Sequence, residues 1–372
     1  MLIAAFHQLL TKNHSWETED EREAMEIFGI KFTPLEVVLQ RYLEMLATMV
    51  TMCGILLLSK MGYLLAIYLF FYSETSRYCV LFYFIWIYYD NYLYPVGGRR
   101  SQFKQWLRTC TWNRYVCNYF PIKLVKTTDL DPKKSYLFCN FPHGIMCCGV
   151  YGAFATDAIG FRELFPGLDI NIIMLDQFFK TPFLRDYVRV INAASSSPES
   201  MNLLLSTKPE APYTGNASVL MPGGAAEIIE SKPGTYRILI KRRKGFVRLS
   251  LKNGVSMVPV CSFGETNVYN QITFPEGSFM KKVMNFIRKI LGLPPFFLIG
   301  RGLSQNYFGF IPRRTPITVV VGSPMHLPKI ENPTDEQINE YHKKFVDHLV
   351  DFFEKEKYKY VENADSVHLE FV

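Results

Sequence analysis

His143 is the residue whose type and position best suit acid–base chemistry in this sequence. It alone of the seven histidines lies between a proline and a glycine directly after an apolar run, 135–140, that predicts a strand. Pro142 stiffens the turn, and Gly144 allows the backbone or a substrate to approach closely. A histidine with an unperturbed pKa of about 6.5 is a natural general base at cellular pH. A capped structural histidine has the same local pattern, so the tripeptide alone leaves both interpretations open.

A second loop with suitable residues is Met221-Pro-Gly-Gly-Ala-Ala-Glu227, which follows a predicted strand at 217–221. The backbone N–H groups of Gly223 and Gly224 are candidate donors to an oxyanion. Glu227 is a candidate to orient a histidine and to stabilise its imidazolium form. Paired glycines are also typical of a tight turn, and on this loop alone the turn is the simpler interpretation.

The third chemical feature is the basic run 241–244, which opens the segment KRRKGFVRLSLKNG. Arg242, Arg243 and Lys244 are candidates to bind phosphates, because the planar guanidinium of arginine pairs with two oxygens at once. A solvated basic face or a contact with lipid headgroups explains the same residues equally well. Neither GxxxxGK[ST] nor GxGxxG occurs, and the absence of GxSxG disfavours a serine esterase.

The eight cysteines show no spacing typical of a metal site. There is no CxxC pair and no histidine at zinc-finger distance from a cysteine, so we expect no structural metal and no cofactor. Several cysteines lie in apolar runs, which is typical of buried thiols in a reducing compartment. Cys147 and Cys148 lie close to His143, but the apolar start of the helix expected there favours burial over a nucleophilic role.

The composition predicts a folded chain that buries a sizeable core. Of the 372 residues, 49% are apolar and 20% are charged, which excludes an intrinsically disordered chain. The net charge of +7 is too small to indicate nucleic acid binding by itself, so no nucleic acid partner is expected.

Two apolar runs near the N-terminus predict a membrane hairpin. Between Glu44 and Glu74 the single charge is Lys60, and after a polar break at 73–77 a second apolar run ends at Tyr89. The first run is long enough to cross a hydrocarbon core of about 30 Å, whereas the second is marginal. The pair is therefore either two transmembrane helices or a re-entrant wedge, and the alternative is a buried hairpin of a soluble domain.

Charge predicts the orientation of this hairpin. Between Asn91 and Thr128 there are basic residues and no acidic ones, an excess that marks the cytosolic side and suits anionic membrane lipids. We therefore expect a cytosolic N-terminal leader at 1–44, a membrane hairpin at 45–95 and a cytosolic-facing, membrane-associated domain at 96–372.

The domain alternates predicted strands and helices, which is typical of an α/β fold with a mainly parallel sheet. Strands are expected at 135–140, 168–175, 217–221, 255–263 and 317–322, and helices at 145–156, 183–190, 237–253, 281–291 and 335–357. The stretch 193–200 is expected to be a loop. The helix at 281–291 is basic and apolar, which suits an interfacial membrane helix and an ordinary surface helix equally. Ligands of parallel sheets bind beyond the carboxyl ends of the strands, where the loops of His143 and Glu227 both lie.

In combination, these segments resemble the acyl-CoA:diacylglycerol acyltransferase type 2 family, which includes monoacylglycerol and wax alcohol acyltransferases. The resemblance covers roughly Tyr88 to His348. Each block is weak support alone, but their order and spacing are specific. The blocks are Pro95-Val-Gly-Gly-Arg-Arg100, Tyr119-Phe-Pro121, Phe141-Pro-His-Gly144, Gly223-Gly-Ala-Ala-Glu227, Arg243-Lys-Gly-Phe246, Val258-Pro-Val260, Phe263-Gly-Glu265, Gly300-Arg-Gly302, Pro316-Ile-Thr318 and Val321-Gly322.

The resemblance implies roles for the residues singled out above. His143 matches the histidine that the family treats as catalytic, with Glu227 orienting it and Gly144, Pro142, Gly223 and Gly224 forming the oxyanion or substrate loops. Arg242, Arg243 and Lys244 are the expected contacts to the phosphates of acyl-CoA, which is a substrate rather than a cofactor.

Phe141 departs from the family, because animal members usually have His and plant members have Glu at this position. Phe141 removes a polar group near the base, which predicts an altered acceptor choice, a lower rate or a degenerate member.

The implied enzyme is an acyl-CoA-dependent O-acyltransferase of the endoplasmic reticulum membrane, with a cytosolic catalytic domain and lipid droplets as a second location. Its implied acceptor is diacylglycerol, with monoacylglycerol or a long-chain alcohol as alternatives, and oligomerisation is left open. A glycerol-phosphate-type acyltransferase is disfavoured, because it needs HxxxxD and Cys148 is the fifth residue after His143. The alternative of another class is a catalytically silent lipid-droplet or membrane scaffold protein.

Overall fold

The computed structural model describes residues 25–27, 30–32, 34–93, 102–271, 274–275, 277–291, 298–302 and 309–372. The block Pro95–Arg100 of the resemblance and most of the expected leader lie outside the described residues.

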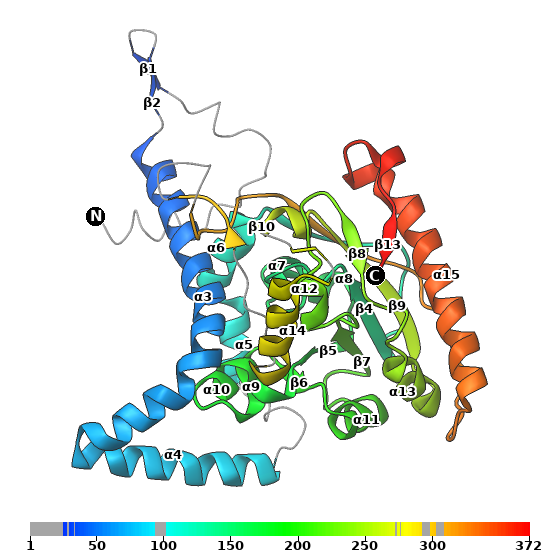
Figure 1. The fold of residues 1–372 in the computed structure, drawn as a ribbon, viewed down its shortest axis with the longest axis horizontal. Coiled ribbons are helices and arrows are strands. Elements are labelled where there is room, and N and C mark those ends of the chain that lie inside the picture. The colour runs from blue at the N-terminus through cyan, green and yellow to red at the C-terminus, as the bar shows by residue number, and fades with distance from the viewer. Residues whose placement is uncertain are drawn as a thin grey trace.

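A sheet of seven strands runs through the domain (Figure 1). Its order is β3-β12-β9-β4-β7-β5-β6, and every neighbouring pair is parallel except β9 and β12. The mainly parallel α/β sheet that the sequence predicts is therefore confirmed. The strands are β3 (Ile122–Lys126), β4 (Tyr136–Phe141), β5 (Leu168–Met174), β6 (Ala193–Ser195), β7 (Gly215–Leu220), β9 (Ser256–Phe263) and β12 (Ile317–Val321).

Apolar side chains form one core on each face of the sheet. Along β4, Phe138 belongs to one core, whereas Leu137 and Phe141 belong to the other, because successive side chains of a strand point to opposite faces. The first core includes residues of α3 and α6, and the second includes residues of α13 and α15, which lie on opposite sides of the sheet in Figure 1. Since both faces are covered, β4 and β9 are buried at every position.

The remaining elements connect and cover the sheet. The helices of the domain are α5 (Gln102–Thr109), α6 (Thr111–Tyr119), α7 (Cys148–Val150), the π-helix η1 (Tyr151–Ala155), α8 (Phe161–Leu164), α9 (Asp176–Lys180), α10 (Leu184–Val190), α11 (Pro198–Ser206), α12 (Ala225–Ile228), α13 (Gly245–Asn253), η2 (Glu265–Asn267), α14 (Phe279–Leu291), α15 (Asp335–Tyr360) and η3 (Ala364–Ser366). Three two-stranded pairs complete the described fold: β1 (Met25–Ile27) with β2 (Ile30–Phe32), β8 (Tyr236–Ile238) with β13 (Leu369–Phe371), and β10 (Asn270–Gln271) with β11 (Leu298–Ile299).

The predicted helix at 237–253 is wrong in its first half. Tyr236–Ile238 form β8, which pairs in parallel with β13 near the C-terminus, and Tyr236 and Ile238 are buried in the second core. This long-range pairing has no local signal in the sequence. Helix α13 begins only at Gly245, and it ends before Gly254, as the Asn-Gly signal predicts.

The predicted helix at 145–156 and the predicted loop at 193–200 also differ from the structure. Gly144 and Cys147 have left-handed φ values of 62° and 54°, so regular helix starts only at Cys148. In the second stretch, β6 pairs with β5, and α11 starts after Ser197, whose hydroxyl accepts a hydrogen bond from the Ser200 N–H.

The two apolar runs form helices α3 (Leu35–Tyr72) and α4 (Glu74–Leu93), joined at Ser73. Figure 1 shows α3 descending along one side of the domain and α4 crossing beneath it, so α4 does not run back along the whole of α3. Within the described residues, Leu35–Ser59 is the one helical segment long and apolar enough to cross a membrane, and Met61–Tyr72 is a shorter apolar segment.

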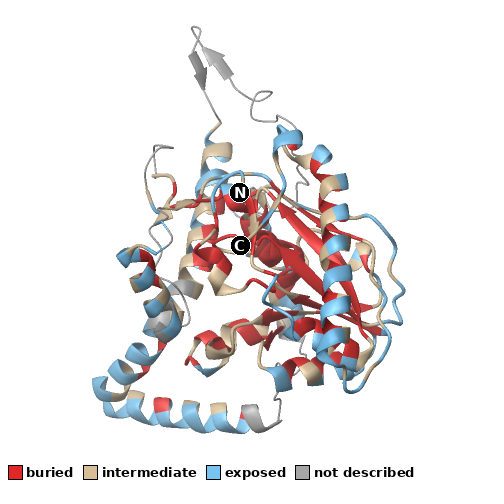
Figure 2. Ribbon diagram, turned by 45° about the vertical axis from the view of Figure 1, so that its right-hand side comes forward, coloured by how far each residue is buried: buried red, intermediate tan, exposed pale blue. Residues whose placement is uncertain are grey.

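Specific polar contacts hold α3 and α4 against the domain. The Trp112 indole N–H donates to the Thr51 hydroxyl at 2.9 Å, and the Tyr63 hydroxyl donates to the Lys180 carbonyl at 2.7 Å. At the far end of α4, Asp90 forms ion pairs with Arg185, at 2.6 Å, and with Arg189 of α10. The opposite side of α4 is exposed, as Figure 2 shows for the helix crossing beneath the domain. The large apolar side chains exposed on α4 are Tyr78, Leu81, Phe82, Phe84, Ile85, Trp86, Tyr88 and Tyr89.

Candidate active site

Three loops meet at the carboxyl edge of the sheet because β9, β4 and β7 are consecutive neighbours. His143 follows β4, Glu227 follows β7 and Glu265 follows β9. The parallel register of these strands brings their carboxyl ends to the same edge, as expected for a ligand site of such a sheet. The structure therefore brings together His143 and Glu227, the two residues that the sequence analysis singled out for acid–base chemistry.

Glu227 holds the backbone of the histidine loop. One carboxylate oxygen accepts the His143 N–H at 2.6 Å and the other accepts the Leu239 N–H at 3.0 Å. We expected Glu227 to orient the imidazole ring, whereas both of its oxygens bind backbone N–H groups. The carboxylate is 1% exposed, and this burial raises the pKa of Glu227 to about 7 against the opposing effect of the two hydrogen bonds and of Arg243.

The imidazole of His143 is partly exposed and points its Nδ1 at its own loop. Nδ1 lies 3.0 Å from the Gly144 carbonyl oxygen and 3.2 Å from the Cys147 sulfur. Because a carbonyl only accepts hydrogen bonds, the proton is assigned to Nδ1, which leaves the lone pair on Nε2. Burial lowers the pKa of His143, although the hydrogen bond to the Gly144 carbonyl opposes this effect. Nε2 lies 3.6 Å from the Cys147 sulfur, and a lone pair on this nitrogen is suited to act as a general base.

The two glycines of the second loop, Gly223 and Gly224, are each needed for a different structural reason. A Cβ atom on Gly223 would lie 1.8 Å from a Glu227 carboxylate oxygen, so no larger residue fits beside the buried carboxylate. Gly224 has a φ of 57° and donates its N–H to the Met221 carbonyl at 3.0 Å. The Gly224 N–H is thus engaged in the tight turn that the sequence analysis considered, rather than available to an oxyanion.

The basic run lies between β8 and α13, next to the second oxygen of Glu227. Arg242, Arg243 and Lys244 are exposed. The positive charge of Arg243 lowers the pKa of Glu227, against the effect of burial. Lys244 is held by α15 through a hydrogen bond of 2.6 Å to the Asn339 side-chain oxygen.

In the sequence analysis, Glu265 has no role beyond its place in a family block, and Phe141 is predicted to remove a polar group near the base. The Glu265 carboxylate lies against the histidine loop, and its signal in the sequence is an acidic residue two positions after a buried strand. The Phe141 side chain is fully buried in the second core, together with Phe263 and Phe353. The departure from the family at this position is therefore accommodated by apolar packing.

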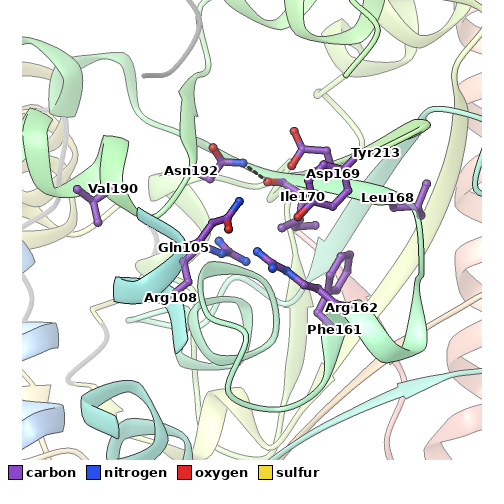
Figure 3. A pocket seen from close by; sticks show the side chains of 10 residues that line it. All are labelled: Gln105, Arg108, Phe161, Arg162, Leu168, Asp169, Ile170, Val190, Asn192 and Tyr213. Carbon is purple, nitrogen blue, oxygen red and sulfur yellow. Dashed lines mark hydrogen bonds between the residues drawn. The ribbon is translucent and has the colours of Figure 1, made fainter. Parts of the chain in front are cut away.

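A shallow hollow lies elsewhere, near the amino end of β5 (Figure 3). It is lined in part by Arg108, Arg162 and Asn192, and Asn192 donates a hydrogen bond to the Ile170 carbonyl. Because β5 begins at Leu168, this hollow is at the opposite end of the strands from His143 and contributes nothing to the site.

The fold and these loops define an α/β domain with a histidine and two buried glutamates at the carboxyl edge of its sheet. Residues 68–371 match the model of the family described as Diacylglycerol acyltransferase. A 2-acylglycerol O-acyltransferase 1 from Bos taurus is 38% identical over 331 residues, which cover 89% of this chain and 96% of the relative. The chain therefore belongs to the diacylglycerol acyltransferase family, and it is an acyltransferase.

Two further relatives carry different acceptors in their names. An acyl-CoA wax alcohol acyltransferase 2 from Mus musculus is 41% identical over 276 residues, which cover 74% of this chain and 80% of the relative. A diacylglycerol O-acyltransferase 2 from Dictyostelium discoideum is 36% identical over 328 residues, which cover 88% of this chain and 96% of the relative. The solved 1-acyl-sn-glycerophosphate (LPA) acyltransferase PlsC from Thermotoga maritima covers 81% of this chain at 15% identity and a TM-score of 0.33, a likeness too low to carry an argument.

Proposed function

We propose that this acyltransferase moves a fatty acyl group from acyl-CoA to the hydroxyl group of a neutral lipid, with diacylglycerol as the acceptor and triacylglycerol as the product. The observation that carries the proposal is the geometry of His143, whose Nδ1 lies 3.0 Å from the Gly144 carbonyl oxygen while its backbone N–H is held by Glu227. The relatives named for 2-acylglycerol and wax alcohol are of similar identity, so monoacylglycerol and a long-chain alcohol are the alternative acceptors.

The proposed reaction uses His143 first as a base and then as an acid. Nε2 takes the proton of the acceptor hydroxyl, and the oxygen attacks the thioester carbonyl, so that a C–O bond forms and a tetrahedral oxyanion develops. Collapse of this intermediate breaks the C–S bond, and the imidazolium returns its proton to the departing CoA thiolate. The backbone N–H groups of Gly144 and Gly223 are the proposed oxyanion donors, since the Gly224 N–H donates to the Met221 carbonyl.

The exposed guanidinium groups of Arg242 and Arg243 are proposed to bind the phosphates of acyl-CoA. The run follows Leu239, whose N–H binds the same carboxylate that holds His143, so phosphates bound by the run would leave the pantetheine arm of acyl-CoA to reach the site. Replacing Arg243 with Ala is expected to raise the KM for acyl-CoA more than it lowers kcat.

The proposed location is the endoplasmic reticulum membrane, with the catalytic domain on the cytosolic side and lipid droplets as a second location. In support, Ala47 and Met52 of the apolar helix α3 belong to the same buried core as Ile145 and Cys148 of the histidine loop. The apolar helix α3 is therefore packed on the domain that carries the site. Helix α14 also has exposed apolar side chains, Phe279 and Phe286, which suit a helix at the membrane interface. On the same helix, Lys281 is buried and forms an ion pair with Glu230 at 2.5 Å.

The test is transfer of radiolabelled oleoyl-CoA in membranes that contain the full chain. Diacylglycerol, monoacylglycerol and a long-chain alcohol are offered separately, to the wild type, to His143→Ala and to the matched control His326→Ala. His326 contacts Ser256 at the start of β9, far from the loop of His143. Labelled triacylglycerol that disappears only in His143→Ala supports the proposal. Absence of product with all three acceptors, from folded and membrane-bound protein, would favour the scaffold alternative.

A further inference from the structure

A second buried glutamate lies against the histidine loop from the side opposite to the paired glycines. Glu265 comes directly after β9 and Gly264, and it is 2% exposed. Gly264 has a φ of 89°, and a Cβ atom there would lie 2.1 Å from the Pro316 carbonyl oxygen, so this tight turn needs glycine. The turn directs Glu265 back along the carboxyl edge of the sheet, where β9 is the neighbour of β4.

The carboxylate of Glu265 satisfies two backbone groups at the end of the histidine loop. One oxygen accepts the Cys148 N–H at 2.8 Å, and the other accepts the Gly149 N–H at 2.7 Å. These N–H groups belong to the start of α7, where a helix provides no internal acceptors. Without the carboxylate, both donors would be buried without a partner, at a cost in stability for each.

Glu265 also contacts the residue next to the histidine. A Cβ atom on Gly144 would lie 2.5 Å from the Glu265 Cγ atom, so the side chain packs directly on the Gly144 backbone. The Gly144 carbonyl is the group that binds Nδ1 of His143. Glu227 fixes the N–H of His143 at the start of the loop, and Glu265 fixes Gly144 and the N–H groups at its end. The loop is thus held at both ends by carboxylates from the two strands that flank β4.

We propose that Glu265 is a positioning residue for the acyl transfer reaction: it fixes the loop 143–149 so that the Gly144 carbonyl holds the His143 ring with Nε2 toward the substrates. This inference rests on the proposed function. Burial raises the pKa of Glu265 to about 7, although the two N–H groups oppose this effect. The side chain offers two oxygens that only accept hydrogen bonds when its carboxyl group is ionised. Glutamine at this position has one acceptor oxygen for two N–H donors, and alanine has none.

The experiment compares Glu265→Gln and Glu265→Ala with a matched control, Glu356→Gln, in the full chain reconstituted in lipid nanodiscs. Glu356 is also buried, at 3% exposure, but it lies on α15 and pairs with Lys359 of its own helix. Two readouts are taken: kcat and KM for oleoyl-CoA per folded enzyme, and hydrogen–deuterium exchange of peptides covering 141–150. We expect kcat to fall about 10-fold in Glu265→Gln and on the order of 100-fold in Glu265→Ala, with KM within about twofold, because misplacing a catalytic group costs turnover rather than binding.

The exchange data separate this inference from the proposed function. Faster exchange at 143–149 in both Glu265 variants, with the fall in kcat, supports the inference, and Glu356→Gln should change neither readout. Unchanged kcat per folded enzyme, or unchanged exchange at 143–149, overturns it. If the wild type turns over no acceptor, the proposed function fails, and the positioning role in catalysis fails with it, even where the exchange data still show that Glu265 holds the loop. If Glu265→Ala does not fold, Glu265→Gln alone decides.

Discussion

Replacing Glu227 with Gln should make the stability of the domain less dependent on pH. Burial raises the pKa of Glu227 from its usual 4.5 to about 7 in the folded state, whereas the unfolded chain keeps the usual value. A carboxyl whose pKa is raised by folding favours the folded state at low pH, and this contribution is lost as pH rises from about 4.5 to about 7. The shift corresponds to a loss of about 3 kcal/mol in the free energy of unfolding. Glutamine does not titrate in this range. Its loss of one acceptor oxygen changes the free energy of unfolding by the same amount at every pH.

The assay is thermal unfolding of the full chain in detergent at pH 5, 6, 7 and 8, for the wild type, Glu227→Gln and the exposed control Glu340→Gln. For a domain of this size about 3 kcal/mol corresponds to a change in Tm of about 6 °C. We expect the fall in Tm between pH 5 and pH 8 to be smaller by about this amount in Glu227→Gln than in the wild type. Glu340 is 57% exposed, so its variant should follow the wild type. Equal pH dependence of Tm in the wild type and Glu227→Gln would refute the argument that burial disfavours the ionised form of this carboxyl group.

Three further predictions follow from particular contacts. Because burial lowers the pKa of His143, kcat/KM should rise with pH through a midpoint below the usual 6.5, and a midpoint above that value would contradict a desolvated base. Gly223→Ala places a methyl group 1.8 Å from the Glu227 carboxylate, so it should lower kcat more than 10-fold and lower Tm in the same preparation. Asp90→Ala removes a carboxylate that contacts the buried Arg185, which keeps its ion pair with Asp186, so the variant should cost about 1.5–3 kcal/mol in urea denaturation. A cost under about 1 kcal/mol would show that the other contacts of α4, such as the hydrogen bond of Tyr83 to Asp186, hold the helix without Asp90.

The sequence predicts most of the sheet because its central strands are continuous apolar runs. The runs at 168–175 and 255–263 correspond to β5 and β9 to within one residue at each end. The short strands were missed because three residues carry little local signal: Ala193–Ser195 and Tyr236–Ile238 are strands only through their pairing with β5 and β13. The same dependence explains the helix predicted at 237–253, where tertiary pairing overrides the local pattern.

The candidate site was predictable in its residues but not in its contacts. The Pro-His-Gly tripeptide and the Gly-Gly-Ala-Ala-Glu loop each follow a strand, and the strand order brings His143 and Glu227 to hydrogen-bonding distance. The sequence could not show that Glu227 binds the histidine backbone rather than its ring, because this depends on the φ values of the loop. Glu265 is more than a hundred residues from His143 along the chain, and only the adjacency of β9 and β4 places it at the loop.

Phe141 shows how far the family pattern can vary without disturbing the histidine loop. It is the last residue of β4, and its side chain points into the second core because Leu137 and Cys139, at alternate positions of the strand, do the same. The loop itself is held by hydrogen bonds from its backbone N–H groups to Glu227 and Glu265, and these contacts do not involve the side chain at position 141. A residue at this position therefore acts on the site through packing at the end of the strand. An apolar ring that fills this core is compatible with the histidine geometry, so Phe141 gives no structural reason to regard the chain as a degenerate member of its family.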